Sequence, residues 1–368
     1  MQSQRSLRGS KNTARKTLLP SALLSLLLLS AYMGFSIYII SSSLMTSSYT
    51  TQIQNMINNG IAITSKEEPY KRKTIERKSH EFPYPLTCST KPRHNPKNPK
   101  RFNVAITYHV GMVKNWKTIL HDQMYTLHQC GLGDLVDKFI LSYSNGKVEE
   151  ILYELQNYSF ATKPDIIVES VKAPWEGAAM NAMREFCLTT TTNTGTMKQQ
   201  QKQQEQQKPT VVFYFHNKGA SRYNSDWKNP SLIEDGKSYA HCLYWRKYME
   251  FYLLERPETC LHRILKGGAR TCGTMLRTEY TPMHYSGNFW AASCDHVGEL
   301  DLMAEGGNYY AAEFWVNSKG IKLEWVCLDN ARLRIPGKDP YHHLVLPELY
   351  WNRTENLLTT GEMEELFF

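Results

Sequence analysis

From Arg101 onward, short apolar runs alternate with stretches of helical periodicity, and this alternation constrains the fold more than any other feature. Runs rich in β-branched and aromatic residues predict buried strands at residues 102–108, 138–143, 165–169 and 210–216. Apolar residues at helical spacing predict helices between them at 116–130, 148–155 and 178–188. The order strand, helix, strand predicts an α/β domain in which βαβ units surround a mostly parallel sheet.

A cluster of polar and basic residues follows the fourth predicted strand directly. His216 ends that strand, Asn217, Lys218 and Gly219 come next, and Arg222 follows three residues later. Ligands of such sheets bind beyond the carboxyl ends of the strands. Lys218 and Arg222 can neutralise phosphate oxygens, and Gly219 allows close approach of the backbone. A diphosphate would suit this cluster, and a polar turn that only closes the strand is the alternative.

Residues 284–290 place polar groups inside an aromatic run. We expect one buried strand that carries the imidazole of His284, the hydroxyl of Ser286 and the amide of Asn288. Buried polar groups need partners, and sugar hydroxyls or structural hydrogen bonds would both supply them.

A lone carboxylate, Glu313, lies among apolar residues at 309–315. Desolvation would favour proton uptake there, which suits a general base, whereas a glutamate on a helix surface is the alternative. The helix predicted at 239–251 has an apolar stripe typical of packing, and Arg246 is its one candidate anion contact.

Several kinds of chemistry are disfavoured by what the sequence lacks. It contains no GxSxG elbow, HExxH helix, P-loop or strand-linked GxGxxG, which argues against the enzyme classes that use them. No CxxC pair occurs, so we do not expect zinc. No Asp-x-Asp follows an apolar strand, and a metal requirement therefore stays open, with His342 or His343 as possible ligands.

The first hundred residues indicate a membrane anchor and a stem. Residues 18–40 carry no charge, and a helix of that length spans the roughly 30 Å of a bilayer core. Five Lys or Arg residues and no acidic residue precede this run, so we expect residues 1–17 in the cytoplasm and the rest in the lumen. A cleaved signal peptide is the alternative. Residues 41–100, rich in Ser, Thr, Asn, Lys and Pro, predict a stem.

Charge and cysteine content agree with this layout. The net charge is +8, but residues 1–102 hold 16 basic and 4 acidic residues, so the remaining chain is mildly acidic and nucleic acid is not an expected partner. All eight Cys follow the apolar run, in a compartment that permits disulfides, although spacing assigns no pairing. Asn157 and Asn352 begin glycosylation acceptor sequences.

The lumenal domain is predicted at residues 101–350, followed by a tail at 351–368. Residues 189–208 combine four consecutive Thr with a Gln/Lys tract that cannot bury a core, so we expect a disordered surface insertion.

Four ordered motifs in residues 101–330 resemble a broad, largely uncharacterised group of glycosyltransferase-like proteins with a GT-A-like (Rossmann-like) fold. The motifs are His-x-Lys-Gly after a strand (His216 to Gly219), Trp-Arg in a helix (Trp245 and Arg246), Ser-Gly-Asn-Phe-Trp (Ser286 to Trp290) and Glu-x-Trp (Glu313 to Trp315). The chain departs from the group at Ala291, where a second Trp is common, and in its Gln-rich insertion.

The resemblance implies transfer of a sugar from a nucleotide diphosphate donor to a glycan, protein or lipid acceptor, in a type II membrane protein of the Golgi or endoplasmic reticulum. It implies that Thr107 and Tyr108 lie near the base or ribose, and that Asn288 and His284 hold sugar hydroxyls.

The same resemblance implies that Glu313 is the base and that Lys218, alone or together with Arg222, does part of the work of the Mn²⁺ or Mg²⁺ usual in GT-A enzymes. A catalytically inactive sugar-binding protein is the main alternative, and a tethered protein that binds partners through its stem is a third.

Overall fold

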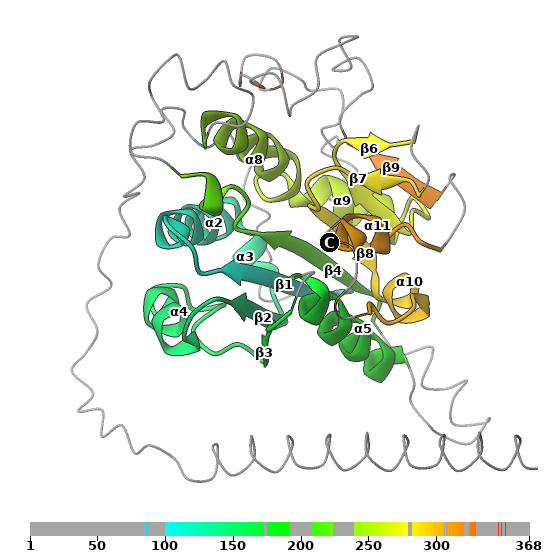
Figure 1. Cartoon of the computed structure of the whole chain (residues 1–368). Helices are drawn as coiled ribbons and strands as arrows, with labels where there is room; N and C mark the ends of the chain where they lie inside the picture. Colours follow the sequence, from blue (N-terminus) through cyan, green and yellow to red (C-terminus); the bar gives the residue numbers. More distant parts are fainter. Residues whose placement is uncertain are drawn as a thin grey trace, which may run out of the picture. The chain divides into compact units, whose positions relative to one another are not determined.

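The computed structural model describes the α/β part of the chain (Figure 1). The described residues are 86, 88, 100–172, 175–191, 208–223, 239–278, 282–304, 306, 308, 310–319, 324–328, 345, 347 and 350, and all belong to the unit 74–368. The predicted tails, the apolar run 18–40, most of the stem, His342, His343 and Asn352 lie outside them. No helix among the described residues has the length and apolar character needed to cross a membrane.

A seven-stranded sheet of order β3-β2-β1-β4-β8-β5-β9 forms the centre of the domain. Its strands are β1 (Asn103–Gly111), β2 (Lys138–Ser144), β3 (Ile166–Glu169), β4 (Thr210–His216), β5 (Thr271–Gly273), β8 (Trp290–Ser293) and β9 (Trp325–Cys327). The first four are parallel, β8 runs antiparallel to both β4 and β5, and β9 is parallel to β5. Strands β6 (Leu276–Arg277) and β7 (His284–Tyr285) form a separate pair. The prediction of a mostly parallel sheet is confirmed.

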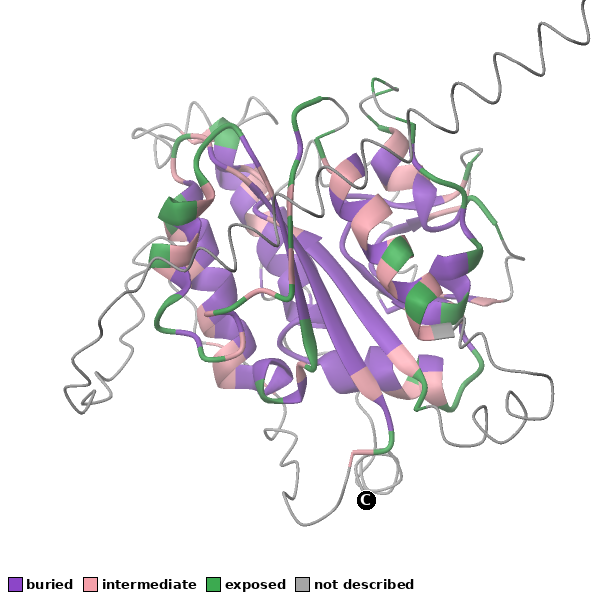
Figure 2. Ribbon diagram, turned by 90° about the horizontal axis from the view of Figure 1, so that it is seen from below, coloured by how far each residue is buried: buried purple, intermediate pink, exposed green. Residues whose placement is uncertain are grey.

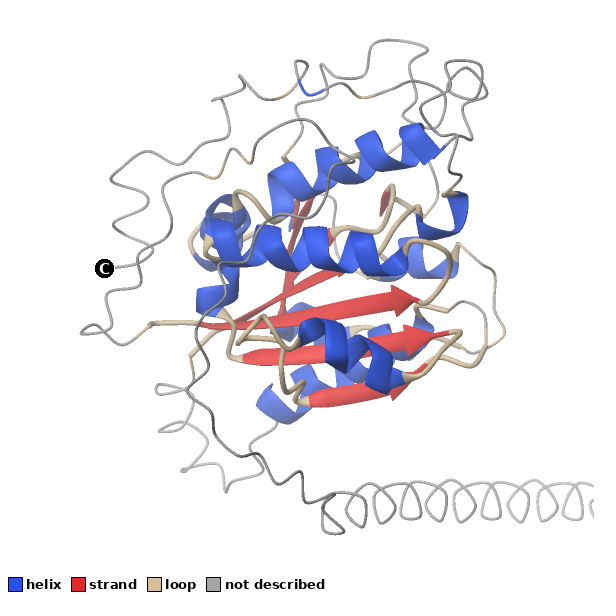
Figure 3. Cartoon of the chain, turned by 90° about the vertical axis from the view of Figure 1, so that its left-hand side faces the viewer, coloured by secondary structure: helices blue, strands red, loops and turns tan. Residues whose placement is uncertain are grey.

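Helices cover both faces of the parallel strands (Figures 1 and 3). The described helices are α2 (Trp116–Cys130), α3 (Leu132–Leu135), α4 (Val148–Leu155), α5 (Gly177–Thr191), α8 (Tyr239–Leu253), α9 (Pro257–Leu265), α10 (Cys294–Glu299), α11 (Ala311–Trp315) and the 3₁₀ turn η1 (Ala220–Arg222). The bounds predicted for α2 and α4 are confirmed. Residues 189–191, expected in the insertion, instead continue α5, because nothing in their sequence breaks the helix.

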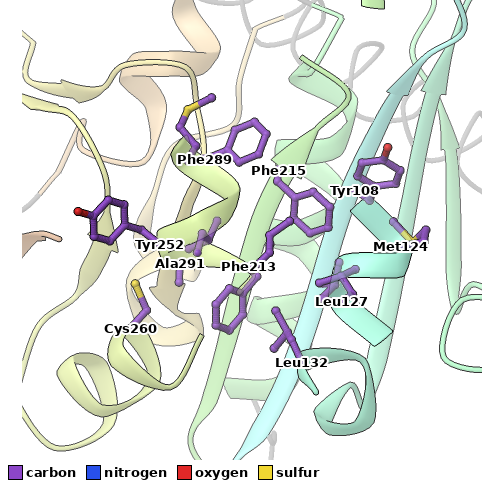
Figure 4. Packing of buried hydrophobic residues seen from close by; sticks show 14 of the residues in the cluster. Tyr108, Met124, Leu127, Leu132, Phe213, Phe215, Tyr252, Cys260, Phe289 and Ala291 are labelled. Atoms are coloured by element: carbon purple, nitrogen blue, oxygen red, sulfur yellow. The ribbon is translucent and has the colours of Figure 1, made fainter. Parts of the chain in front are cut away.

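The central strands β1 and β4 are buried along most of their length and separate two hydrophobic clusters (Figure 2). Successive side chains of a strand point to opposite faces, so Phe213 and Phe215 pack with α2 and α8 in one cluster (Figure 4). Val212 and Tyr214 pack with α5 and α10 in the other. His216 therefore faces α5, on the same side as Tyr214.

The single buried strand predicted at 284–290 is wrong. Strand β7 ends at Tyr285, and β8 begins only at Trp290. Between them Gly287 and Asn288 adopt φ angles of 91° and 59°, and glycine and asparagine are the residues that tolerate this left-handed region best. A side chain at position 287 would also lie 2.5 Å from Sδ of Met249. The resulting turn carries Asn288 toward α5.

Disulfides connect Cys88 to Cys130, Cys187 to Cys294, and Cys260 to Cys272. Cys242 and Cys327 lie outside these pairs. The second disulfide fastens α5 to the start of α10 across 107 residues, whereas the third spans only 12. Both pairs are buried, so they differ mainly in the length of chain that they close.

Replacing Cys187 and Cys294 together by Ser should lower the free energy of unfolding by about 2–5 kcal/mol, measured by denaturant titration. The loss should exceed that of the Cys260→Ser, Cys272→Ser variant by about 2 kcal/mol, because the longer loop restricts the unfolded chain more. An equal or smaller loss for the longer loop would contradict this account.

Candidate functional site

Two histidines lie side by side at the carboxyl ends of β1 and β4. His109 and His216 are register partners in the parallel pairing, so their side chains project to the same face. His216 was expected here from the sequence. His109 was missed because β1 continues to Gly111, three residues beyond the predicted end of the strand. Both rings face the side of the sheet on which α5 packs.

Glu176, which immediately precedes α5, supplies a carboxylate to the same place. Its Oε1 lies 3.3 Å from Nδ1 of His216, and its Oε2 accepts a hydrogen bond from Nδ2 of Asn288. The N-terminus of a 15-residue helix such as α5 also favours a negative charge. Sequence analysis missed Glu176, although its position in the loop after the third strand places it at the carboxyl edge of the sheet.

Asn288 orients this carboxylate. Its Oδ1 accepts a hydrogen bond of 2.8 Å from Nε1 of Trp290, while its Nδ2 donates to Glu176. Both ends of the amide are therefore engaged within the protein. In this geometry the amide holds Glu176, and the role of Asn288 in holding sugar hydroxyls stays a prediction.

Lys218 lies just after the end of β4 and is the cation of the candidate site. Its Nζ is 4.1 Å from the centre of the Trp245 ring on α8, a cation–π contact that leaves the ammonium able to attract anions. It interacts electrostatically with Glu176 and Glu313. Gly219, with φ of 89°, turns the chain against α8, where a Cβ atom would lie 2.9 Å from that of Cys242.

Glu313 projects from α11 and is partly buried. Burial raises the pKa of its carboxyl above the ordinary value, and the charge of Glu176 raises it further. Lys218 and the backbone of Gly287 act in the opposite direction without cancelling the shift. This direction agrees with the sequence-based expectation that desolvation favours proton uptake at Glu313.

The pKa values of Glu176 and of the two imidazoles are shifted downward, in the direction opposite to the shift of Glu313. Burial by itself would raise the pKa of Glu176, but the attraction of His216, His109, Asn288 and Lys218 outweighs it and lowers that pKa. Burial lowers the pKa of His109 to about 4 and also lowers that of His216, in spite of the nearby Glu176. The site of the free protein thus holds an anionic Glu176 between neutral imidazoles.

Other predicted site residues hold the fold together. The amide of Asn217 accepts from the Gly111 N–H at 2.9 Å and donates to its carbonyl at 2.8 Å. Thr107 and Tyr108 are fully buried, and the Tyr108 hydroxyl donates to Gln123. The hydrogen bonds of Asn217 and Tyr108 hold the end of β1 to the residue after β4 and to α2. Thr107 and Tyr108 have no exposed atoms for the predicted contact with a base or ribose.

Arg246 is buried on the other face of the sheet, where it pairs with Asp122 at 3.6 Å and with Glu250 at 3.3 Å. It is not placed with the histidines. Arg222 is exposed on η1 close to the end of β4.

His284 and Ser286 are buried beside α11, with the His284 ring edge-on to Phe314 at 4.8 Å. The predicted glycosylation site Asn157 is exposed after α4. Within the described part of the chain, no three His, Cys, Asp or Glu side chains are grouped as ligands for a metal ion.

The depressed pKa of His109 predicts a specific pH dependence of stability. The folded protein resists protonation of His109 until about pH 4, whereas an unfolded histidine takes up a proton near pH 6.5. The contribution to stability is therefore complete above pH 6.5 and is lost as the pH falls toward 4, by about 3 kcal/mol in total.

His109→Gln should flatten the slope of unfolding free energy against pH in this window, measured by urea titration at several pH values. His128→Gln, at a partly exposed position of α2, is the control and should keep the wild-type slope. Identical slopes in all three proteins would show that His109 is not the group responsible.

Comparison with known proteins places the chain in a family. The model of the family described as a domain of unknown function (DUF8361) matches residues 102–305, a stretch that contains β1 to β8, both histidines, Glu176, Lys218 and Asn288. No curated protein matches the chain. Because the match covers more than half of the sequence, the chain belongs to the DUF8361 family.

Proposed function

We propose that the chain is a glycosyltransferase that moves a sugar from a nucleoside diphosphate donor to a glycan, protein or lipid acceptor. One observation carries the proposal. A lysine and two carboxylates with opposite pKa shifts, Glu176 and Glu313, are coupled to one another beyond the carboxyl ends of β1 and β4. That edge is where α/β sheets bind their ligands.

Lys218 would bind the diphosphate. When the bond between the sugar and the diphosphate breaks, the leaving group keeps the bonding electron pair and its negative charge grows. An ammonium group already held in place by Trp245 would stabilise that charge without reorganisation.

Glu313 would accept the proton of the acceptor hydroxyl as its oxygen forms the new bond to the sugar. A carboxylate whose pKa is raised by burial is a better base than an exposed one, because its pKa lies closer to the working pH. The buried His284 packs against Phe314, the neighbour of Glu313, and so supports this part of α11.

Topology and compartment also support the proposal. Four parallel strands in the order β3-β2-β1-β4, continued by an antiparallel β8, are compatible with the GT-A-like fold that the motifs imply. The disulfides and the exposed Asn157 are compatible with a lumenal domain behind a type II membrane anchor in the Golgi or endoplasmic reticulum.

The described residues do not offer the carboxylate pair that holds Mn²⁺ or Mg²⁺ in GT-A enzymes, since His216, Asn217 and Lys218 occupy the corresponding place.

A panel of nucleoside diphosphates and nucleotide sugars, with and without Mn²⁺, should contain at least one compound that raises the melting temperature of the secreted domain 74–368, which keeps the disulfide between Cys88 and Cys130. A ligand at 100 times its Kd adds about 2.7 kcal/mol to the free energy of unfolding. Lys218→Ala should weaken the binding of this compound 10- to 100-fold, because a charge-assisted contact contributes about 1.5–3 kcal/mol.

Lys163→Ala, at an exposed site after α4, is the matched control and should bind like the wild type. Stabilisation by no member of the panel would count against the transferase and favour a protein that binds sugar alone.

Glu313→Gln should keep donor binding and lose at least about 100-fold in sugar transfer, the size of effect expected for a general base. Transfer is measured by release of the nucleoside diphosphate in the presence of mixed acceptors. Glu150→Gln, at an exposed position of α4, should transfer at the wild-type rate. Wild-type turnover in Glu313→Gln would remove the base assignment.

A further inference from the structure

Both ring nitrogens of His216 face oxygen atoms that accept hydrogen bonds. Nε2 lies 3.1 Å from the carbonyl oxygen of Gly287, and Nδ1 lies 3.3 Å from Oε1 of Glu176. A neutral imidazole has a single N–H and can satisfy only one of them, while its other nitrogen turns a lone pair toward the second oxygen. One additional proton on the pair of His216 and Glu176 would satisfy both contacts.

The arrangement is fixed from several sides, so the two acceptors cannot simply move apart. Asn288 donates to the other oxygen of Glu176 and is itself held by Trp290, at a left-handed φ of 59°. The carbonyl of Gly287 belongs to the same turn. The backbone of His216 is also held in place, because its carbonyl accepts a hydrogen bond of 3.0 Å from Nε2 of Gln123.

The charges that surround His216 make the free site unfavourable for an anion. His109, Lys218 and Tyr214 face the pair of His216 and Glu176, and Glu313 faces Glu176 and Lys218 from α11. Burial keeps the imidazoles neutral in the free protein, which leaves Glu176 negatively charged. A diphosphate that approaches Lys218 therefore meets a carboxylate within the same cluster.

We propose that binding of a nucleoside diphosphate beside Lys218 is coupled to the uptake of one proton by the pair of His216 and Glu176. This coupling rests on the proposed function. The proton changes the net charge of the pair from −1 to zero and so removes its repulsion of the anion. It also completes a hydrogen bond between Nδ1 of His216 and Oε1 of Glu176. Glu176 is in this scheme a positioning residue that acts through His216, and it does not itself contact the diphosphate.

The coupling is measured by isothermal titration calorimetry of UDP and of GDP between pH 7 and pH 9, where a terminal phosphate with a pKa of about 6 is already ionised. Titrations in buffers of different ionisation enthalpy count the protons taken up. We expect the wild type to take up close to one proton for each nucleotide bound. Its affinity should therefore decrease as the pH rises, by up to about tenfold per pH unit.

Glu176→Gln distinguishes the coupling from structural damage. A glutamine amide can donate to Nδ1 of His216 and its oxygen can accept from Asn288, so the contacts survive while the charge and the proton are lost. We expect this variant to bind with no proton uptake, a much weaker pH dependence, and a higher affinity than the wild type at pH 9. A merely structural role would weaken binding at every pH.

Glu185→Gln, at an exposed position of α5, is the matched control and should retain the proton uptake of the wild type. If Glu176→Gln does not fold, the proton count of the wild type decides, and a count near zero overturns the coupling. Binding without proton uptake overturns the coupling alone, whereas failure of UDP, GDP and every other nucleoside diphosphate of the panel to bind overturns the proposed function as well.

Discussion

The amide of Asn217 holds together the two strand ends on which the site is built. It bonds to both the N–H and the carbonyl of Gly111, so that β1 and β4 cannot separate where their parallel pairing ends. Each hydrogen bond contributes only about 1 kcal/mol to stability. Their main effect is on geometry, because they fix where the two strand ends lie relative to each other. They keep His109 beside His216, which is the arrangement that gives Glu176 two imidazoles to face.

The opposite face of the sheet supports the same strand ends through buried polar groups. Gln123 of α2 receives the Tyr108 hydroxyl and donates to the carbonyl of His216. Its neighbour Asp122 pairs with Arg246 and Lys247 of α8 in a region with almost no solvent exposure. Breaking a buried pair of this kind costs about 3–5 kcal/mol, so α2 and α8 are held in one arrangement and the backbone of His216 with them.

Sequence patterns predicted the α/β class, the parallel strands and which strand ends meet, because periodicity and chain order determine these features. They could not predict the part played by Asn217, since an amide after a strand serves a ligand or a neighbouring backbone equally well. The turn at Gly287 and Asn288 was also beyond their reach. Its aromatic neighbours are typical of a strand, and only packing against Met249 shows why the chain must turn.

Glu176 shows most clearly why a site needs tertiary structure to be found. On its own the residue is a glutamate before a helix, a common and unremarked position. Its environment lowers its pKa, while the pKa of Glu313, which interacts electrostatically with Glu176, is raised. Two carboxylates whose pKa values are shifted in opposite directions by their surroundings can have different chemical roles at the same pH. The lowered pKa favours the charged form of Glu176, which Asn288 holds, and the raised pKa favours proton uptake by Glu313 on α11.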